Sequence, residues 1–62
     1  MSMTPIRSSA IRAVGYDGNT LFVKFSNGRT YPHRGCPYRH FEGLLNASSP
    51  GAYYNRYIRG RY

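Results

Sequence analysis

The alternation of hydrophobic and polar residues between positions 11 and 33 predicts three short β-strands in succession. Three apolar runs in this segment are separated by residues 17–19 and 26–28, which contain Asp, Asn, Ser and Gly and can therefore reverse the chain. The middle run, residues 21–25, is rich in aromatic and β-branched side chains, and its odd-numbered positions are all hydrophobic. We expect an antiparallel meander in which this run is the central strand, with one buried face.

The turn before the third strand permits two registers, which place different side chains in the core. If Asn27 and Gly28 form a two-residue turn, Tyr31 and His33 lie on the solvent face. The platform for stacking bases would then consist of Phe22, Lys24, Tyr31 and His33. If Gly28 instead closes a type I turn with a G1 bulge, Tyr31 lies opposite Val23 and packs in the core. We favour the bulged register because it collects more apolar groups on one face.

The first hairpin and the N-terminal segment complete the expected sheet. A four-residue loop at residues 17–20 would place Val14 and Tyr16 on the buried face, opposite Val23 and Leu21. Residues 1–9 lack apolar periodicity, so they are expected to form an extended N-terminal arm, and residues 10–62 a single domain.

Two short helices are predicted after the strands. Pro37 suits the first position of a helix, because its missing N–H would have no partner there, and this helix is expected to end near Asn46. Ser49 and Pro50 offer an N-cap and a first helical residue for a second helix that reaches about Arg59. The stripes expected to face the sheet are Tyr38, Phe41, Leu44 and Leu45 in the first helix, and Tyr54, Tyr57 and Ile58 in the second. The first helix is expected to turn Arg39, His40, Glu42 and Asn46 toward water.

The predicted fold class is therefore α+β, with a three-stranded antiparallel β-meander followed by two short helices packed on one face. A chain of 62 residues forms one domain with a thin core. It has no room for a deep catalytic cavity. Gly43, inside the first helix, costs about 1 kcal/mol relative to Ala, so it either allows a close backbone contact or is a tolerated weakness at the surface.

The charge of the chain points to a polyanionic or acidic partner. Nine Lys and Arg residues against Asp17 and Glu42 give a formal net charge of +7, and eight of the nine are Arg. Arginine presents a planar fork that matches phosphate and carboxylate and also stacks on bases. Arg56, Arg59 and Arg61 are expected to form a basic ridge on and after the second helix.

The residues selected as candidates for binding nucleic acid or a partner are Lys24, Arg34, Arg56, Arg59 and Arg61, with Phe22, Arg29, Tyr31, His33 and Arg39 as secondary candidates. Asn55 is expected to bond a loop backbone. Arg59 could clamp the chain's own carbonyl or carboxylate groups or reach a phosphate.

Catalytic and metal sites are disfavoured by the positions of the residues that could form them. His33, Cys36 and His40 match no common zinc spacing, and a nucleophilic pair of Cys36 with a histidine would lack a substrate pocket. The two carboxylates belong to a turn and a helix, so they do not suggest an acid–base pair. We expect no enzymatic activity, no metal, no cofactor and no small-molecule substrate.

Localisation follows from what the sequence lacks. No apolar run approaches the roughly 20 residues needed to span a bilayer, and the polar N-terminus has no apolar signal-peptide core. The single cysteine, Cys36, cannot form an internal disulfide. A soluble cytoplasmic protein with no membrane partner is expected.

The chain resembles a known family through motifs spread over nearly its whole length. These are Ser8-Ser9-Ala10-Ile11, Val14-Gly15-Tyr16-Asp17, Leu21-x-Val23-x-Phe25, Gly28 with Tyr31, Pro37, Glu42-Gly43-Leu44-Leu45-Asn46-Ala47 and Gly51-x-Tyr53-Tyr54-Asn55-x-x-Ile58-Arg59-x-x-Tyr62. Together they resemble the KTSC domain, a small module named after the C-terminal region of some lysyl-tRNA synthetases and also found in free-standing bacterial and phage-borne proteins. His33 departs from the Tyr-x-Tyr that this family tends to show in the third strand.

Charge and resemblance together favour one function, with one alternative. The resemblance implies nucleic-acid binding, so we expect a small basic accessory module that binds nucleic acid, RNA rather than DNA, through an Arg-rich surface. The alternative is a phage or bacterial module that binds an acidic protein surface and modulates a larger nucleic-acid machine, such as RNA polymerase, a synthetase or a defence complex.

Overall fold

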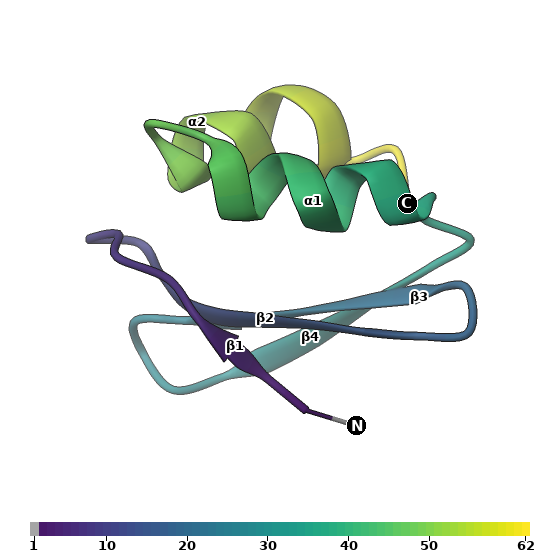
Figure 1. Cartoon of the computed structure of the whole chain (residues 1–62), viewed down its shortest axis with the longest axis horizontal. Coiled ribbons are helices and arrows are strands. Elements are labelled where there is room, and N and C mark those ends of the chain that lie inside the picture. Colours follow the sequence, from purple (N-terminus) through teal and green to yellow (C-terminus); the bar gives the residue numbers. More distant parts are fainter. Residues whose placement is uncertain (1) are drawn as a thin grey trace.

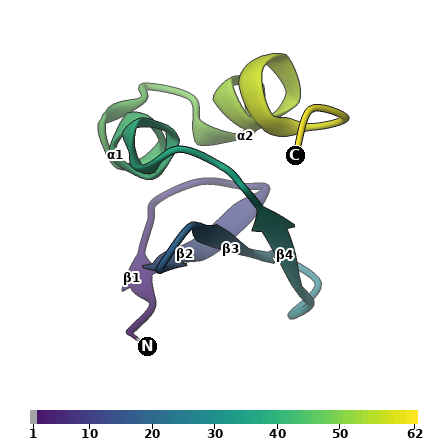
Figure 2. The ribbon, with the colours of Figure 1, turned by 90° about the vertical axis from the view of Figure 1, so that its right-hand side faces the viewer.

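A four-stranded antiparallel sheet forms one layer of the molecule, and the helical segments lie together on one of its faces (Figures 1 and 2). The computed structural model describes residues 2–62. The elements in chain order are β1 (Thr4–Pro5), β2 (Ile11–Asp17), β3 (Thr20–Phe25), β4 (Thr30–Arg34), α1 (Tyr38–Asn46), α2 (Pro50–Tyr53) and the π-helical segment η1 (Tyr54–Ile58). The sheet follows the order β1-β2-β3-β4, so the expected α+β meander is confirmed, with one strand more than expected.

The additional strand comes from the N-terminal arm. Thr4 pairs with Val14 and Pro5 with Ala13, and the backbone N–H of Ile6 donates to the carbonyl oxygen of Arg12 at 2.8 Å. Two paired residues are too few to show a hydrophobic period, which is why the expectation of three strands was wrong. Because β1 is an edge strand, Pro5 can belong to it without a donor being lost inside the sheet.

The first hairpin is tighter than predicted. Asp17 pairs with Thr20, so the turn contains two residues rather than the four expected, and Gly18 adopts a φ of 65° at its first position. Such two-residue turns match the twist of the strands that they join. The facing pairs are unaffected, because Val14 still lies opposite Val23.

The second hairpin adopts the bulged register, as predicted. Val23 lies opposite Tyr31, the backbone N–H of Phe25 donates to the carbonyl oxygen of Arg29 at 2.8 Å, and Gly28 has a φ of 88°. The prediction that Tyr31 is buried was wrong, since 43% of its surface is exposed. Its strand, β4, lies at the edge of the sheet, so the ring has neighbours on one side only.

Replacing Gly28 with alanine is expected to lower the free energy of unfolding by about 1–2 kcal/mol. A Cβ at this position would meet no atom within 4 Å, so the cost comes from the positive φ rather than from a collision. Urea unfolding measures the change, and Ser26→Ala in the same turn is the control. Equal stability of both variants would contradict the bulged turn.

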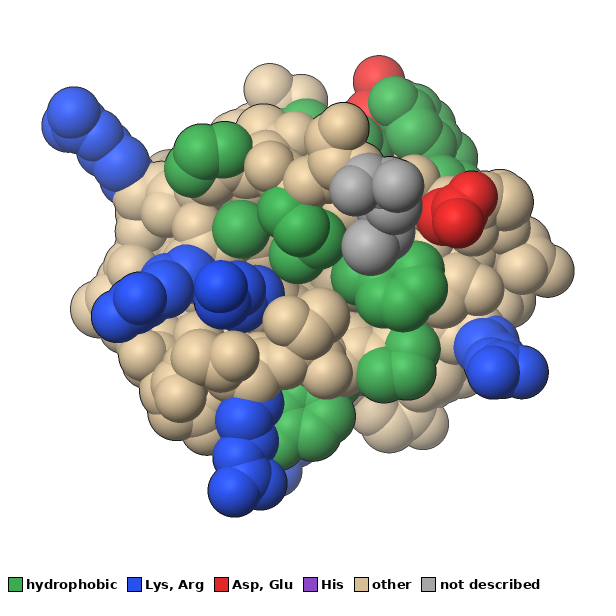
Figure 3. All heavy atoms as spheres, turned by 90° about the horizontal axis from the view of Figure 1, so that it is seen from below, with side chains coloured by type: hydrophobic (Ala, Val, Ile, Leu, Met, Phe, Trp, Pro, Cys, Tyr) green, Lys and Arg blue, Asp and Glu red, His purple; other side chains and the backbone are tan. Residues whose placement is uncertain are grey.

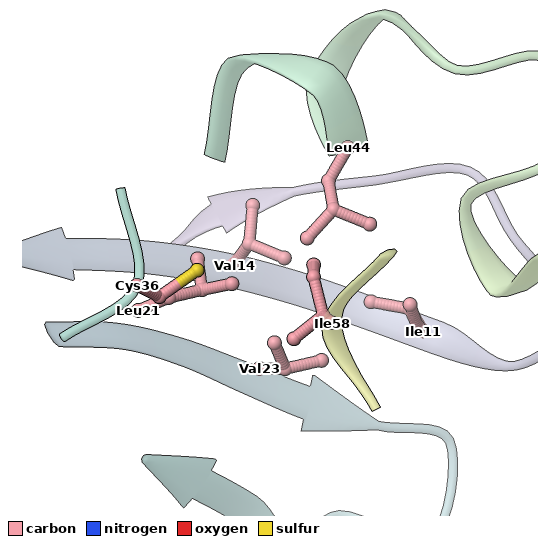
Figure 4. Close-up of a cluster of buried hydrophobic side chains, with 7 residues drawn as sticks. All are labelled: Ile11, Val14, Leu21, Val23, Cys36, Leu44 and Ile58. Carbon is pink, nitrogen blue, oxygen red and sulfur yellow. The ribbon is translucent and has the colours of Figure 1, made fainter. Parts of the chain in front are cut away.

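The core lies between the sheet and the helices, where side chains from both layers meet (Figure 4). Its fully buried members are Ile11, Val14, Leu21, Val23, Cys36, Leu44 and Ile58. Phe25, Phe41 and Tyr54 pack against it while partly exposed.

Three residues expected in the inward stripes, Tyr38, Leu45 and Tyr57, are exposed instead. The buried residues of α1 are His40 and Leu44, one turn apart, so the helix is rotated from the expected orientation and the expectation that His40 faces water was wrong.

The helix boundaries agree with the sequence to within a residue or two. Pro37 is the N-cap of α1 rather than its first residue, and Pro50 is the first residue of α2 after Ser49 at the N-cap, as expected. The Ser49 side chain makes no capping hydrogen bond. The unexpected feature is that the second helix continues as a π-helix, in which the backbone N–H of Arg59 donates to the carbonyl oxygen of Tyr54 at 2.9 Å.

Candidate nucleic-acid interface

An aromatic cluster joins the second hairpin to the last helical segment. The ring of Phe25 makes edge contacts with Tyr31, at 5.5 Å between centroids, and with Tyr54, at 5.1 Å. Edge-to-face packing of this kind fixes the orientation of each ring. The exposed ring of Tyr31 is therefore held in place by the half-buried rings behind it.

A hollow of about 470 Å³ opens beside this cluster. We call it the Tyr31 groove, and its lining residues are Ala10, Phe25, Tyr31, Gly51, Tyr54, Asn55 and Arg59. Two of the predicted site residues, Tyr31 and Arg59, thus share one surface although they belong to separate parts of the chain. Ala10 and Gly51 also line the groove, but their side chains carry no functional group, so nothing in the sequence marked them as site residues.

His33 supports the groove from within. Only 8% of its surface is exposed, its Nε2 shares a hydrogen bond of 3.1 Å with the Tyr54 hydroxyl, and its Nδ1 lies 3.4 Å from the carbonyl oxygen of Tyr62. Burial raises the pKa of Tyr54, partly offset by the charge of Arg59. The phenol therefore remains protonated at neutral pH. This places His33 as a support for Tyr54 rather than as a surface contact.

The predicted basic ridge does not form one continuous surface. Arg59 lines the Tyr31 groove, whereas Arg56 lies over the ring of Tyr57, 5.6 Å from its centroid, and Arg61 lines a separate hollow. The spacing that predicted the ridge assumed a regular α-helix. Here the helix widens to π geometry and ends at Ile58, so the side chains that follow take other directions.

The remaining predicted residues lie elsewhere. Lys24 pairs with Thr30, and Arg34 pairs with Thr20. By this register both basic residues lie, with Phe22, on the face of the sheet opposite the helices. Figure 3 shows this face, with apolar side chains across its middle and Lys and Arg side chains spread around them. Arg29 is exposed after the second turn, and Arg39 lines the same hollow as Arg61.

The residues with catalytic or metal-binding potential are held apart. Within residues 2–62 no three His, Cys, Asp or Glu side chains are grouped so that they could hold a metal ion. Burial raises the pKa of the Cys36 thiol against the opposing charge of Arg39, so the thiol stays protonated. In the same described part of the chain, no helix is long and apolar enough to cross a membrane.

Comparison with known proteins identifies the domain. The KTSC domain model matches residues 7–62. This chain belongs to the KTSC domain family. A protein of Tsukamurella paurometabola is 39% identical over 62 residues, and the match covers 97% of this chain and 92% of that protein. A protein of Stutzerimonas stutzeri is 31% identical over 64 residues, and the match covers 100% of this chain and 90% of that protein.

A solved KTSC domain protein shares the same fold. The crystal structure of the Yersinia pestis protein superposes with a TM-score of 0.89 at 32% identity, covering 97% of this chain and 87% of that one. All residues of the Tyr31 groove fall within the part that matches the KTSC model.

Proposed function

We propose that this KTSC domain binds single-stranded RNA in the Tyr31 groove. The observation that supports the proposal is the presence of an exposed, braced tyrosine ring and an arginine in one hollow. Exposed aromatic rings stack on unpaired bases, and arginine pairs with the phosphate backbone. The net charge of +7 adds long-range attraction for a polyanion.

Each lining residue has a distinct role in this proposal. Tyr31 offers a ring face to one base, Arg59 contacts the adjacent phosphate, and the Asn55 amide can bond a base edge. Lys24 and Arg34, on the opposite face of the sheet, contribute only through the overall charge.

Binding to a fluorescent single-stranded RNA, measured by anisotropy at several salt concentrations, tests the proposal. Tyr31→Ala is expected to weaken binding by about tenfold, since a stacked base contributes about 1–3 kcal/mol. Arg59→Gln is expected to weaken it and to reduce the slope of log affinity against log salt by about 1.

Arg34→Gln is the matched control, because it removes the same charge from the other face. Equal losses in Arg34→Gln and Arg59→Gln would reject the groove while keeping nonspecific RNA binding. Absence of binding at low salt would reject the function. Tyr31→Ala should lower the unfolding free energy by only about 1 kcal/mol, the size of one aromatic pair, so the variant is testable as a folded protein.

The alternative function, docking on a protein of a larger nucleic-acid machine, is supported by the open sheet face. Figure 3 shows apolar side chains across the middle of this face, Lys and Arg side chains around them and acidic side chains at one edge. By the register of β3 with β4, Phe22 belongs to this face, and the basic side chains suit an acidic protein surface. Affinity capture from lysate with and without ribonuclease separates the two functions. Capture of one protein that survives ribonuclease and is lost in Phe22→Ala favours docking, whereas loss of all partners on ribonuclease treatment favours RNA.

A further inference from the structure

A second hollow of about 470 Å³ lies on the helical side of the molecule, and it shares no residue with the Tyr31 groove. We call it the Arg61 groove, and its lining residues are Arg39, His40, Tyr53, Tyr57, Arg61 and Tyr62. They come from α1, from the second helix and from the residues after it. Its volume lies within the range typical of small-molecule sites.

The charge of this groove is positive and unbalanced. Arg39 and Arg61 both line it, and neither of the chain's acidic residues, Asp17 and Glu42, does. Burial lowers the pKa of His40 most, and the positive charges of Arg39 and Arg61 lower it further. Two arginine side chains and one buried imidazole therefore line the same hollow.

The imidazole of His40 is held with one nitrogen accessible. Its Nδ1 lies 3.0 Å from the Tyr53 hydroxyl, whose own pKa is raised by burial, so this phenol keeps its proton. No buried side-chain nitrogen or oxygen in residues 2–62 lacks a hydrogen-bond partner. Nε2 of His40 makes no hydrogen bond within that part of the chain, so it must reach solvent.

The tyrosine rings fix this arrangement. The His40 ring stacks near Tyr57, at 6.2 Å between centroids and 22° between planes, and lies 5.6 Å from the ring of Tyr62. We assign the tautomer in which the Tyr53 hydroxyl donates to Nδ1, which leaves Nε2–H as a donor. The groove then offers two guanidinium forks and one oriented N–H.

We propose that the Arg61 groove is a binding site for a phosphate monoester, held by Arg39, Arg61 and the Nε2–H of His40. A phosphate monoester is a compact anion whose terminal oxygens match these three donors, and paired arginines favour phosphate geometry. The ester can be a free nucleotide or the phosphorylated end of an RNA strand. The inference is independent of RNA binding at Tyr31.

Nuclear magnetic resonance of the labelled full chain tests this site with inorganic phosphate and then AMP, against chloride at equal ionic strength. Saturable shifts of the His40 ring and of the Arg39 and Arg61 side-chain N–H signals are expected with phosphate and absent with chloride. Bound phosphate should also raise the pKa of His40, because it offsets the two guanidinium charges. Shifts that do not saturate, or that chloride reproduces, would overturn the proposal.

Variants at exposed arginines locate the site. Arg39→Gln and Arg61→Gln are each expected to weaken phosphate binding by about tenfold. Arg56→Gln removes the same charge from a residue of η1 that does not line the Arg61 groove, so it is the matched control and should bind normally. Equal phosphate binding by all three variants would overturn the assignment. Tyr31→Ala is expected to bind phosphate as tightly as the unaltered protein.

An RNA oligonucleotide with a 5′-phosphate, compared with its 5′-hydroxyl form and with AMP, distinguishes the two sources. Tighter binding of the phosphorylated strand than of both its hydroxyl form and AMP identifies the end of an RNA, and tighter binding of AMP than of the phosphorylated strand identifies a free nucleotide. Equal binding of the phosphorylated and hydroxyl strands, together with no binding of AMP, would overturn the site.

Discussion

Replacement of Leu44 by alanine is expected to lower the free energy of unfolding by about 2–5 kcal/mol. Leu44 is fully buried and projects from α1 into the core, toward Val14 and Ile58 (Figure 4). Alanine would leave a cavity there, since neither the strands nor the second helix can move in without breaking other contacts. In a domain of 62 residues this loss is a large part of the total stability.

Leu45→Ala is the matched control, because it makes the same chemical change one residue along the same helix. Leu45 is 39% exposed, so its replacement is expected to cost under about 1 kcal/mol. Urea unfolding followed by circular dichroism compares the two variants. A greater loss in Leu45→Ala than in Leu44→Ala would show that α1 faces the sheet in the other orientation.

Gly43→Ala is expected to destabilise the domain by about 1–3 kcal/mol, although alanine is the better helix former by about 1 kcal/mol. A Cβ at Gly43 would collide with the phenol end of Tyr53. To make room, the ring must move, which disturbs its hydrogen bond to His40 and its packing on Tyr57. Gly43 is therefore required by a close side-chain contact, whereas the sequence had suggested a backbone contact or a surface weakness.

A double-mutant cycle distinguishes this collision from a general intolerance at Gly43. In a Tyr53→Ala background the obstructing ring is absent, so Gly43→Ala is expected to become neutral or stabilising by up to about 1 kcal/mol. Urea unfolding of the four proteins provides the coupling energy. An equal loss with and without the Tyr53 ring would contradict the contact between the two helices.

The local patterns of the sequence were sufficient to predict the positions of the two hairpins, although not the length of the first turn. Alternation in residues 21–25 identified the central strand, and the larger number of apolar groups that it collects on one face favoured the bulged register. Pro50 and Ser49 likewise marked the start of the second helix. Each of these features depends on residues within a few positions of one another, so no knowledge of the packed structure is required.

The candidate site could be predicted only in part. Arg59 and Tyr31 were both selected from the sequence, but on separate grounds, and their presence in one groove depends on how η1 packs beside the second hairpin. The π-helical geometry of η1 also separated Arg56, Arg59 and Arg61, which a regular helical spacing had joined into one ridge. The sequence contains no strong signal for this change of helical pitch.

By itself, therefore, the sequence determined the order of β2, β3, β4 and the helices, the positions of the two hairpin turns and the positive charge of the chain. The tertiary structure alone decided that His40, rather than Leu45, joins Leu44 in facing the core, that Pro5 adds a strand, and that Tyr31 remains exposed. Periodicity shows that a helix has an apolar stripe, yet neighbouring positions differ by only about 100° of rotation. The side of the stripe that is buried is settled by the shapes of the surfaces that pack together. In this structure the phenol end of Tyr53 lies close against Gly43 of α1.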